Sequence, residues 1–188
     1  MSILLSLTPF AVFFALMRLH SPVAGFVAAF AVSAILCVHE RVSGRSVKIL
    51  EIGSLILFGF LLAYTWLARP AWTVATVRLA VDLGLLAIVL VSLAIRLPFT
   101  LQYARETVPE QYWAMPVFLA ANRAISWVWA GAFAALVAAD ALAEWVPAVP
   151  LWADVAGSVA AFVIAVWFSR WYPGVVRRRA LAAAGMPA

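Results

Sequence analysis

Long apolar runs separated by short polar intervals constrain the fold of this chain more than any other feature. Hydrophobic residues make up 67% of the 188 residues, charged residues make up only 11%, and the mean hydropathy is +1.06. Soluble domains are roughly half apolar and about a quarter charged. A helix that crosses a bilayer needs roughly 20 mostly apolar residues, because the hydrocarbon core is about 30 Å thick. The sequence therefore predicts an all-α, polytopic membrane protein.

Six segments approach this length and predict a six-transmembrane-helix bundle that forms a single transmembrane domain over residues 1–174. The first two segments are short and meet at Ser21-Pro22, so they form either two full spans or a tight helical hairpin. Pro9 lies inside the first segment, where neighbouring helices of a membrane protein can satisfy the freed carbonyl. The predicted spans cover residues 3–19, 22–38, 49–67, 77–95, 121–142 and 149–169.

The basic residues test the span count independently, because cytoplasmic loops of membrane proteins carry an excess of Lys and Arg. With six spans and a cytoplasmic N-terminus, ten of the 13 basic residues fall on the cytoplasmic side. Another number of spans would scatter these ten over both faces, so both termini are predicted to be cytoplasmic. The cytoplasmic set is Arg41, Arg45, Lys48, Arg96, Arg105, Arg123, Arg170, Arg177, Arg178 and Arg179, and the other set is Arg18, Arg69 and Arg78.

The net charge of +5 does not indicate nucleic-acid binding, because the basic residues form short clusters between apolar runs instead of lining one face. We interpret them as topology signals and as contacts to membrane lipids. Residues 175–188 form a basic cytoplasmic tail that contains Arg177, Arg178 and Arg179. This tail is either a short helix on anionic lipid or a frayed terminus.

The stretch from Arg96 to Arg123 is the one long polar, aromatic and proline-marked interval of the chain. Pro98 is predicted to stop the fourth span, and residues 100–105 can form a short helix on the membrane surface. The sequence Thr107-Val-Pro-Glu110 matches a capping box with proline in the first turn, which predicts a helix from about Val108. Pro116 should kink that helix. The stretch is therefore predicted to be a cytoplasmic amphipathic elbow between helices 4 and 5.

This elbow is the best candidate for a surface that contacts a partner or lipid headgroups. In the short helix, Leu101 and Tyr103 are expected to point inward. The alternative is a simple connector between two spans. The candidate contact residues are Phe99, Gln102, Tyr103, Arg105, Glu106, Tyr112, Trp113, Asn122 and Arg123.

Charged residues inside a bilayer are costly and suggest function, so their depth matters. Glu51 is expected about one turn into the third span, and Asp82 near the outer end of the fourth, four residues after Arg78. No charged residue is expected at the midplane, which weighs against an ion-coupled transporter. Glu51, Arg78 and Asp82 are the candidates for a transport path, and interfacial, paired charges are the alternative.

Catalytic and cofactor motifs are absent from the sequence, so an enzyme is the less favoured class and no cofactor is expected. The single Cys37 excludes an internal disulfide and a CxxC redox pair. His20 and His39 are predicted at opposite membrane surfaces, too far apart to ligate one haem. HExxH, GxSxG and phosphate-loop motifs do not occur, and no metal site is expected.

Small residues repeat every four positions in three spans and predict close helix packing. The repeats pack either within the chain or against a protein partner or a second copy. They comprise Ala153, Gly157, Ala161, Ala165 and Ser169 in the sixth span, Gly25, Ala29 and Ser33 in the second, and Ala130, Ala134 and Ala138 in the fifth.

Several short motifs follow in a characteristic order. The chain opens with Leu-Thr-Pro9-Phe-Ala-Val-Phe-Phe14, a basic stretch at residues 41–48 precedes the third span, and Arg96-Leu-Pro98 follows the fourth. Trp113, Asn122 and Trp127 then lead into an aromatic fifth span. This order distantly resembles the intracellular septation protein A family of bacterial inner-membrane proteins. The resemblance implies a multi-pass protein of the bacterial cytoplasmic membrane, with a non-catalytic role in an envelope or division-related assembly.

Three functions remain open. The leading hypothesis is a non-enzymatic interaction or accessory protein, such as a subunit of a larger membrane complex. The alternative is a small-solute or ion transporter or channel. A third hypothesis, an enzyme that acts on lipid at the elbow, depends only on the interfacial Tyr and Arg residues.

Overall fold

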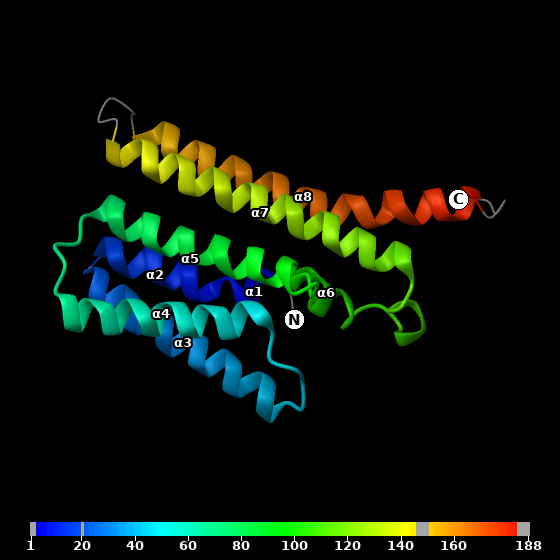
Figure 1. Ribbon diagram of the computed structural model, residues 1–188, viewed down its shortest axis with the longest axis horizontal. Helices are drawn as coiled ribbons and strands as arrows, with labels where there is room; N and C mark the ends of the chain where they lie inside the picture. Colours follow the sequence, from blue (N-terminus) through cyan, green and yellow to red (C-terminus); the bar gives the residue numbers. More distant parts are fainter. Residues whose placement is uncertain (1–2, 20, 146–150, 184–188) are drawn as a thin grey trace. The chain divides into compact units, whose positions relative to one another are not determined.

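The computed structural model describes residues 3–19, 21–145 and 151–183, and every regular element within these ranges is a helix (Figure 1). The predicted all-α class is therefore confirmed. The chain forms two compact units, Met1–Ser92 and Leu93–Ala188. The first two residues of the predicted sixth span, 149 and 150, and the last five of the predicted tail, 184–188, lie outside the described residues.

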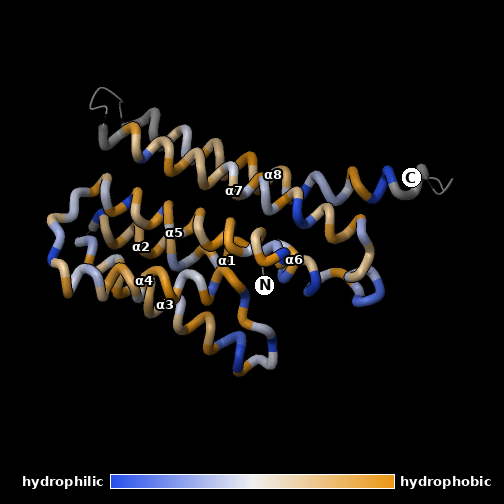
Figure 2. Tube along the Cα trace, in the orientation of Figure 1, coloured by the Kyte–Doolittle hydropathy of each residue, from blue (hydrophilic) through white to orange (hydrophobic). Residues whose placement is uncertain are grey.

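Five of the described helices are long and apolar enough to cross a bilayer, which agrees with a multi-pass membrane protein. Figure 2 shows that hydrophobic residues dominate these helices and that hydrophilic residues gather mainly in the connections. The five helices are α3 (Pro22–Val42), α4 (Ile49–Ala68), α5 (Val74–Ala94), α7 (Pro116–Trp145) and α8 (Leu151–Ala183).

The first predicted span, residues 3–19, is divided into α1 (Ile3–Ser6) and α2 (Thr8–Leu19). Pro9 accounts for the division, because it has no backbone N–H to donate to the preceding turn. The chain instead tightens locally, and the Phe10 N–H donates to the Leu7 carbonyl at 3.1 Å. The apolar part of α2, Thr8–Arg18, is shorter than the five candidate spans and is not one of them.

The first unit is built around phenylalanine rings from α2, α3 and α4. The Phe13 ring is fully buried, stacks on Phe26 at 5.3 Å between centroids, and contacts Phe58 at 5.7 Å. Gly25 permits this contact between α2 and α3, since a Cβ there would come within 2.9 Å of the Phe13 ring. The predicted small-residue stripe of the second span, which also contains buried Ala29 and Ser33, therefore packs within the chain.

Helix α5 begins at Val74, three residues before the predicted start. Thr73 and Thr76 form a reciprocal cap, in which each backbone N–H donates to the hydroxyl oxygen of the other residue at 3.0 Å. This arrangement satisfies N–H groups at a helix N-terminus that would otherwise lack partners. The earlier start puts Asp82 eight residues after the first residue of the helix, instead of five.

The second unit contains α6 (Phe99–Ala104), the 3₁₀ turn η1 (Glu110–Tyr112), α7 and α8. Trp129 is the centre of its aromatic core, with ring centroids 6.3 Å from Phe99 on α6 and 5.2 Å from Phe162 on α8. The Trp129 indole N–H also donates to the Ser169 hydroxyl oxygen at 2.9 Å. One buried tryptophan thus joins three helices.

The predicted helix start near Val108 is wrong, because α7 begins at Pro116. The Thr107 hydroxyl donates to the Ala104 carbonyl at 3.1 Å, so it completes the end of α6 instead of capping a new helix. Pro116 does not kink α7 but starts it, where the missing N–H costs nothing. The short helix expected after Pro98 is present as α6, and Leu101 and Tyr103 are buried as predicted.

The basic tail predicted from residue 175 continues α8 without a break, since the helix extends through Pro173 to Ala183. The small-residue stripe of α8 has two different surroundings. Ala165 is fully buried, whereas Gly157 is exposed and a Cβ there would meet nothing within 4 Å. In α7, Ala130 is buried but Ala134 and Ala138 are exposed, so that predicted stripe is not a continuous packing face within the described chain.

Candidate functional site

A buried ion cluster joins the end of α3 to the start of α4. Glu40 is 0% exposed and Lys48 is 1% exposed, and their Oε2 and Nζ atoms lie 3.0 Å apart. The Arg45 Nε atom lies 3.2 Å from the same Glu40 oxygen. Two cations therefore share one carboxylate oxygen, as expected for a buried charge that must be paired.

The turn between α3 and α4 brings Arg45 back to Glu40. Gly44 has a φ of 69°, a left-handed conformation that glycine adopts without strain. The reversal lets the Arg45 N–H donate to the Glu40 carbonyl at 3.0 Å. The Arg45 guanidinium also lies 3.3 Å from the His39 Nε2 atom. The second Glu40 oxygen, Oε1, is buried without a hydrogen-bond partner among the described residues.

Glu51, a candidate for a transport path, caps α4. Its Oε2 atom accepts from the Lys48 backbone N–H at 3.1 Å, and its Oε1 atom accepts from the Ser6 hydroxyl at 3.0 Å. Glu51 and Ser6 are both fully buried. The Oε1 contact thus holds α1 against the first turn of α4, and the Oε2 contact caps α4 itself. Helix α1 therefore lies at the end of the first unit where the α3–α4 turn leads into α4.

Asp82 lies deeper in α5 than the sequence indicated. It is 2% exposed, and it comes eight residues after the helix start at Val74, about 12 Å along a helix about 31 Å long. Asp82 is therefore further from the start of its helix than the sequence indicated, and the absence of charged residues from the membrane midplane stays a prediction. Arg78, one helical turn earlier, is half-buried, and both residues take part in polar or electrostatic contacts.

Three candidate residues of the Arg96–Arg123 stretch are buried and have packing roles. Phe99, Tyr103 and Asn122 are at most 6% exposed, and the Phe99 ring contacts both Tyr103 and Trp129. Thr100, which the sequence analysis did not single out, donates to the Asn122 carbonyl oxygen at 2.8 Å and lies 2.8 Å from the Ser126 hydroxyl. A buried threonine two residues after Pro98 thus anchors α6 on α7.

The other candidate residues lie nearer the surface. The Arg105 guanidinium lies 5.2 Å from the centroid of the Trp113 ring, and the Trp113 indole N–H donates to the Val108 carbonyl at 2.8 Å. Glu106, Tyr112 and Arg123 are exposed, while Gln102, Arg105 and Trp113 are half-buried. The connection between α6 and α7 is therefore folded by internal contacts and still presents polar and aromatic side chains.

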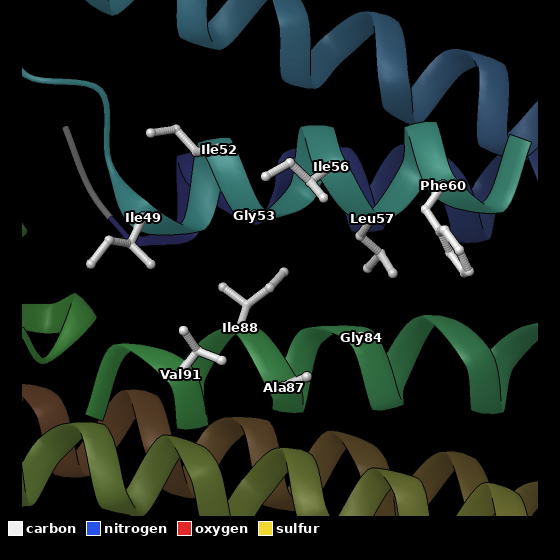
Figure 3. Close-up of a pocket in the computed structure, with 10 residues that line it drawn as sticks. All are labelled: Ile49, Ile52, Gly53, Ile56, Leu57, Phe60, Gly84, Ala87, Ile88 and Val91. Atoms are coloured by element: carbon white, nitrogen blue, oxygen red, sulfur yellow. The ribbon is translucent and has the colours of Figure 1, made fainter. Parts of the chain in front are cut away.

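An apolar groove with a volume of about 430 Å³ lies between α4 and α5 (Figure 3). Its floor consists of two reciprocal contacts. Ile88 of α5 fits against Gly53 of α4, and Leu57 of α4 fits against Gly84 of α5 (Figure 3). A Cβ at Gly53 would lie 2.7 Å from the Ile88 side chain, so the glycine leaves the space that this side chain occupies. The full lining is Ile49, Ile52, Gly53, Ile56, Leu57, Phe60, Gly84, Ala87, Ile88 and Val91.

Across the described ranges, no three His, Cys, Asp or Glu side chains gather closely enough to hold a metal ion. The residues that the sequence singled out as candidate sites have different settings in the structure. Glu51 belongs to a helix cap, Asp82 lies within α5, and other candidates are exposed in the α6–α7 connection. Comparison with protein family models, curated proteins and solved structures gave no match to this chain.

Proposed function

We propose that this protein is a non-enzymatic, multi-pass interaction protein of the bacterial cytoplasmic membrane, acting as an accessory subunit of a larger membrane assembly. A partner would bind the connection between α6 and α7. A role in an envelope or division-related assembly would follow from the resemblance to the intracellular septation protein A family. The proposed topology has six crossings, counting α1 and α2 as the first, with both termini in the cytoplasm.

Two observations support this topology. The Ser6–Glu51 hydrogen bond holds α1 beside the start of α4, and the connection that leads into α4 carries the basic residue Arg45. Basic residues of short loops favour the cytoplasmic side. Helix α2 then leads away from this end of the first unit and is followed by α3, which begins at Pro22.

The observation that carries the proposed function is the combination of order and exposure in residues 105–115. Backbone hydrogen bonds at Tyr112, Trp113 and Met115 fold this segment, and the Arg105–Trp113 contact braces it. Even so, Tyr112 is 44% exposed and Met115 is exposed as well. Exposed tyrosine and methionine on a pre-organised segment suit a protein contact, because little conformational entropy is lost on binding.

Replacing both Tyr112 and Arg123 with alanine is expected to disrupt partner binding. Buried aromatic and arginine side chains dominate most interfaces, so recovery of the partner should fall at least about tenfold. The measurement is quantitative mass spectrometry of proteins that co-purify with the tagged full-length chain in mild detergent. Folding should be unaffected, because both side chains are exposed in this structure.

The matched control is the double variant Arg18→Ala and Tyr64→Ala, which removes an exposed arginine and an exposed tyrosine from the first unit. It should retain full recovery of the same protein. Equal recovery with wild type and with the Tyr112 and Arg123 variant would count against this surface. Loss of the protein in both double variants would indicate a nonspecific effect of removing surface side chains.

A second candidate, a small-solute or ion transporter, is favoured by one observation. Asp82 is a buried carboxylate near the middle of α5, one of the candidate membrane spans, and ionisable residues inside membrane helices often belong to ion or proton pathways. If the protein conducts protons, Asp82→Asn should reduce flux into pyranine-loaded proteoliposomes to the level of empty liposomes, and Asp82→Glu should retain part of it. Wild-type flux in the Asp82→Asn variant would exclude this pathway.

A further inference from the structure

The C-terminal half of α8 has two faces that differ in exposure. The first face packs against α7, and its residues are buried or half-buried: Ala165, Phe168, Ser169, Tyr172 and Val176. The other face is exposed and consists of Trp167, Arg170, Trp171, Gly174, Arg177 and Arg178. Since an α-helix has 3.6 residues per turn, these six residues lie within about 60° of Gly174 around the helix axis. We call this surface the Trp–Arg face.

The Trp–Arg face is aromatic at one end and basic along its length. Trp167 is 56% exposed and Trp171 is 44% exposed, and their rings stack with centroids 5.1 Å apart. Arg170 and Arg177 are seven residues apart, which is about 10 Å along the helix. Gly174 lies between them, and a Cβ there would meet nothing within 4 Å. An open space over this glycine is therefore flanked by an arginine on each side.

Acidic residues do not balance the charge of this face. The sequence has no Asp or Glu after Asp154, and α7 has none before Asp140. Helices α7 and α8 are antiparallel, since Trp129 contacts Ser169 whereas Phe133, one turn later in α7, contacts an earlier ring of α8. Asp140 therefore lies toward the opposite end of the helix pair. Within the described ranges the three arginines form no ion pair, so the face suits an anionic ligand.

The position of the face along α8 indicates the source of the anion. Helix α8 is a candidate membrane span, and from Leu151 through Ser169 it is about 28 Å long. The hydrocarbon core of a bilayer is about 30 Å thick, so Arg170 lies where the core ends and the lipid phosphates begin. Tryptophan is enriched at this level of membrane proteins. A second copy of the same face would instead bring like charges together.

We propose that the Trp–Arg face of α8 is a binding site for the headgroup of an anionic phospholipid. The phosphate lies over Gly174 between Arg170 and Arg177, and the stacked tryptophans contact the upper part of the acyl chains. Figure 2 shows the hydrophilic residues at this end of α8. The proposal depends on α8 crossing the membrane, and it does not depend on the protein partner proposed for the α6–α7 connection.

The test measures lipid binding by native mass spectrometry of the purified full-length protein. The probes are phosphatidylglycerol and phosphatidylcholine with identical acyl chains. Wild-type protein is expected to bind phosphatidylglycerol more tightly. Arg177→Gln should lower the phosphatidylglycerol affinity about fivefold and leave the phosphatidylcholine affinity unchanged, because a basic residue near a membrane surface contributes about a factor of five. Adding Arg170→Gln should bring the loss to about 25-fold.

Arg179→Gln is the matched control, because it removes the same charge two residues away. Arg179 is exposed like Arg177, but it lies about 140° from Gly174 around the helix axis and therefore outside the Trp–Arg face. This variant should lower the phosphatidylglycerol affinity by less than about twofold. All three substitutions change exposed side chains, so the melting temperatures of the variants should match that of the wild-type protein.

Three results would overturn the proposal. Equal affinity of wild-type protein for the two lipids would remove the anion preference. Equal losses in Arg177→Gln and Arg179→Gln would show that net charge acts without a defined face. Undiminished lipid binding by the Arg170 and Arg177 double variant, with loss of an acidic protein that co-purifies with wild type, would assign the face to that protein. Loss of partners in the Tyr112 and Arg123 variant would not alter any of these outcomes.

Discussion

Replacing Lys48 with methionine is expected to lower the free energy of unfolding by about 3–5 kcal/mol, because it leaves a buried carboxylate short of a cation. Glu40 is fully buried, and its Oε2 atom contacts the Lys48 Nζ atom at 3.0 Å. Arg45 also contacts this oxygen, but it is exposed to solvent and compensates the charge less well. Methionine matches the length of the lysine side chain, so the loss of charge is the main change.

The measurement is thermal unfolding in detergent, monitored by tryptophan fluorescence. Arg41→Met is the control, since this arginine is exposed one residue after Glu40, and it should change stability by less than about 0.5 kcal/mol. The double variant Glu40→Gln and Lys48→Met removes both buried charges and should recover most of the loss. If the double variant is no more stable than Lys48→Met alone, the unpaired carboxylate is not the cause.

Trp129→Ala is expected to cost about 3–5 kcal/mol in the second unit, a magnitude typical of deleting a buried aromatic side chain. Trp129 is 1% exposed and contacts rings from α6 and α8 as well as Phe133 in its own helix. The substitution also removes the indole N–H that donates to the Ser169 hydroxyl oxygen. Both losses weaken the contact between α7 and α8, so unfolding should occur at a clearly lower temperature.

Trp127→Ala is the matched control, because Trp127 lies in the same helix but is 53% exposed. It should change stability by less than about 1 kcal/mol in detergent. Trp129→Phe separates the two contributions, since it keeps a ring and loses only the indole donor, with an expected cost of about 1–2 kcal/mol. Similar melting temperatures for Trp127→Ala and Trp129→Ala would contradict the central position of Trp129.

The helix starts that carry a local signal could be predicted from the sequence, and those without a recognised signal could not. The start of α3 was predicted at Pro22, where Ser21 caps the helix and proline occupies the first turn. Its end was predicted at Val38 because charged residues follow, yet the helix continues to Val42. Glu40 stays helical because Lys48, eight residues later, neutralises its charge.

The candidate sites were harder to predict, because their residues are far apart in the sequence. Ser6 and Glu51 are separated by 45 residues, and no local pattern relates them. The Thr73–Thr76 cap is local but lacks the Glu or Gln that marks a capping box, and missing it placed the start of α5 three residues too late. In the α6–α7 connection a helix start was predicted where there is none. Thr107 matched the capping-box pattern, but its hydroxyl donates to the carbonyl of Ala104, three residues earlier.

The Ser6–Glu51 hydrogen bond also sets an order of events during synthesis. A ribosome adds about 5–20 residues per second, so Glu51 is made about 2–9 seconds after Ser6, with 45 residues between them. Until then α1 has no acceptor on α4, and α2 and α3 can pair through Phe13 and Phe26 first. The N-terminal segment is therefore secured only after the first turn of α4 has been translated.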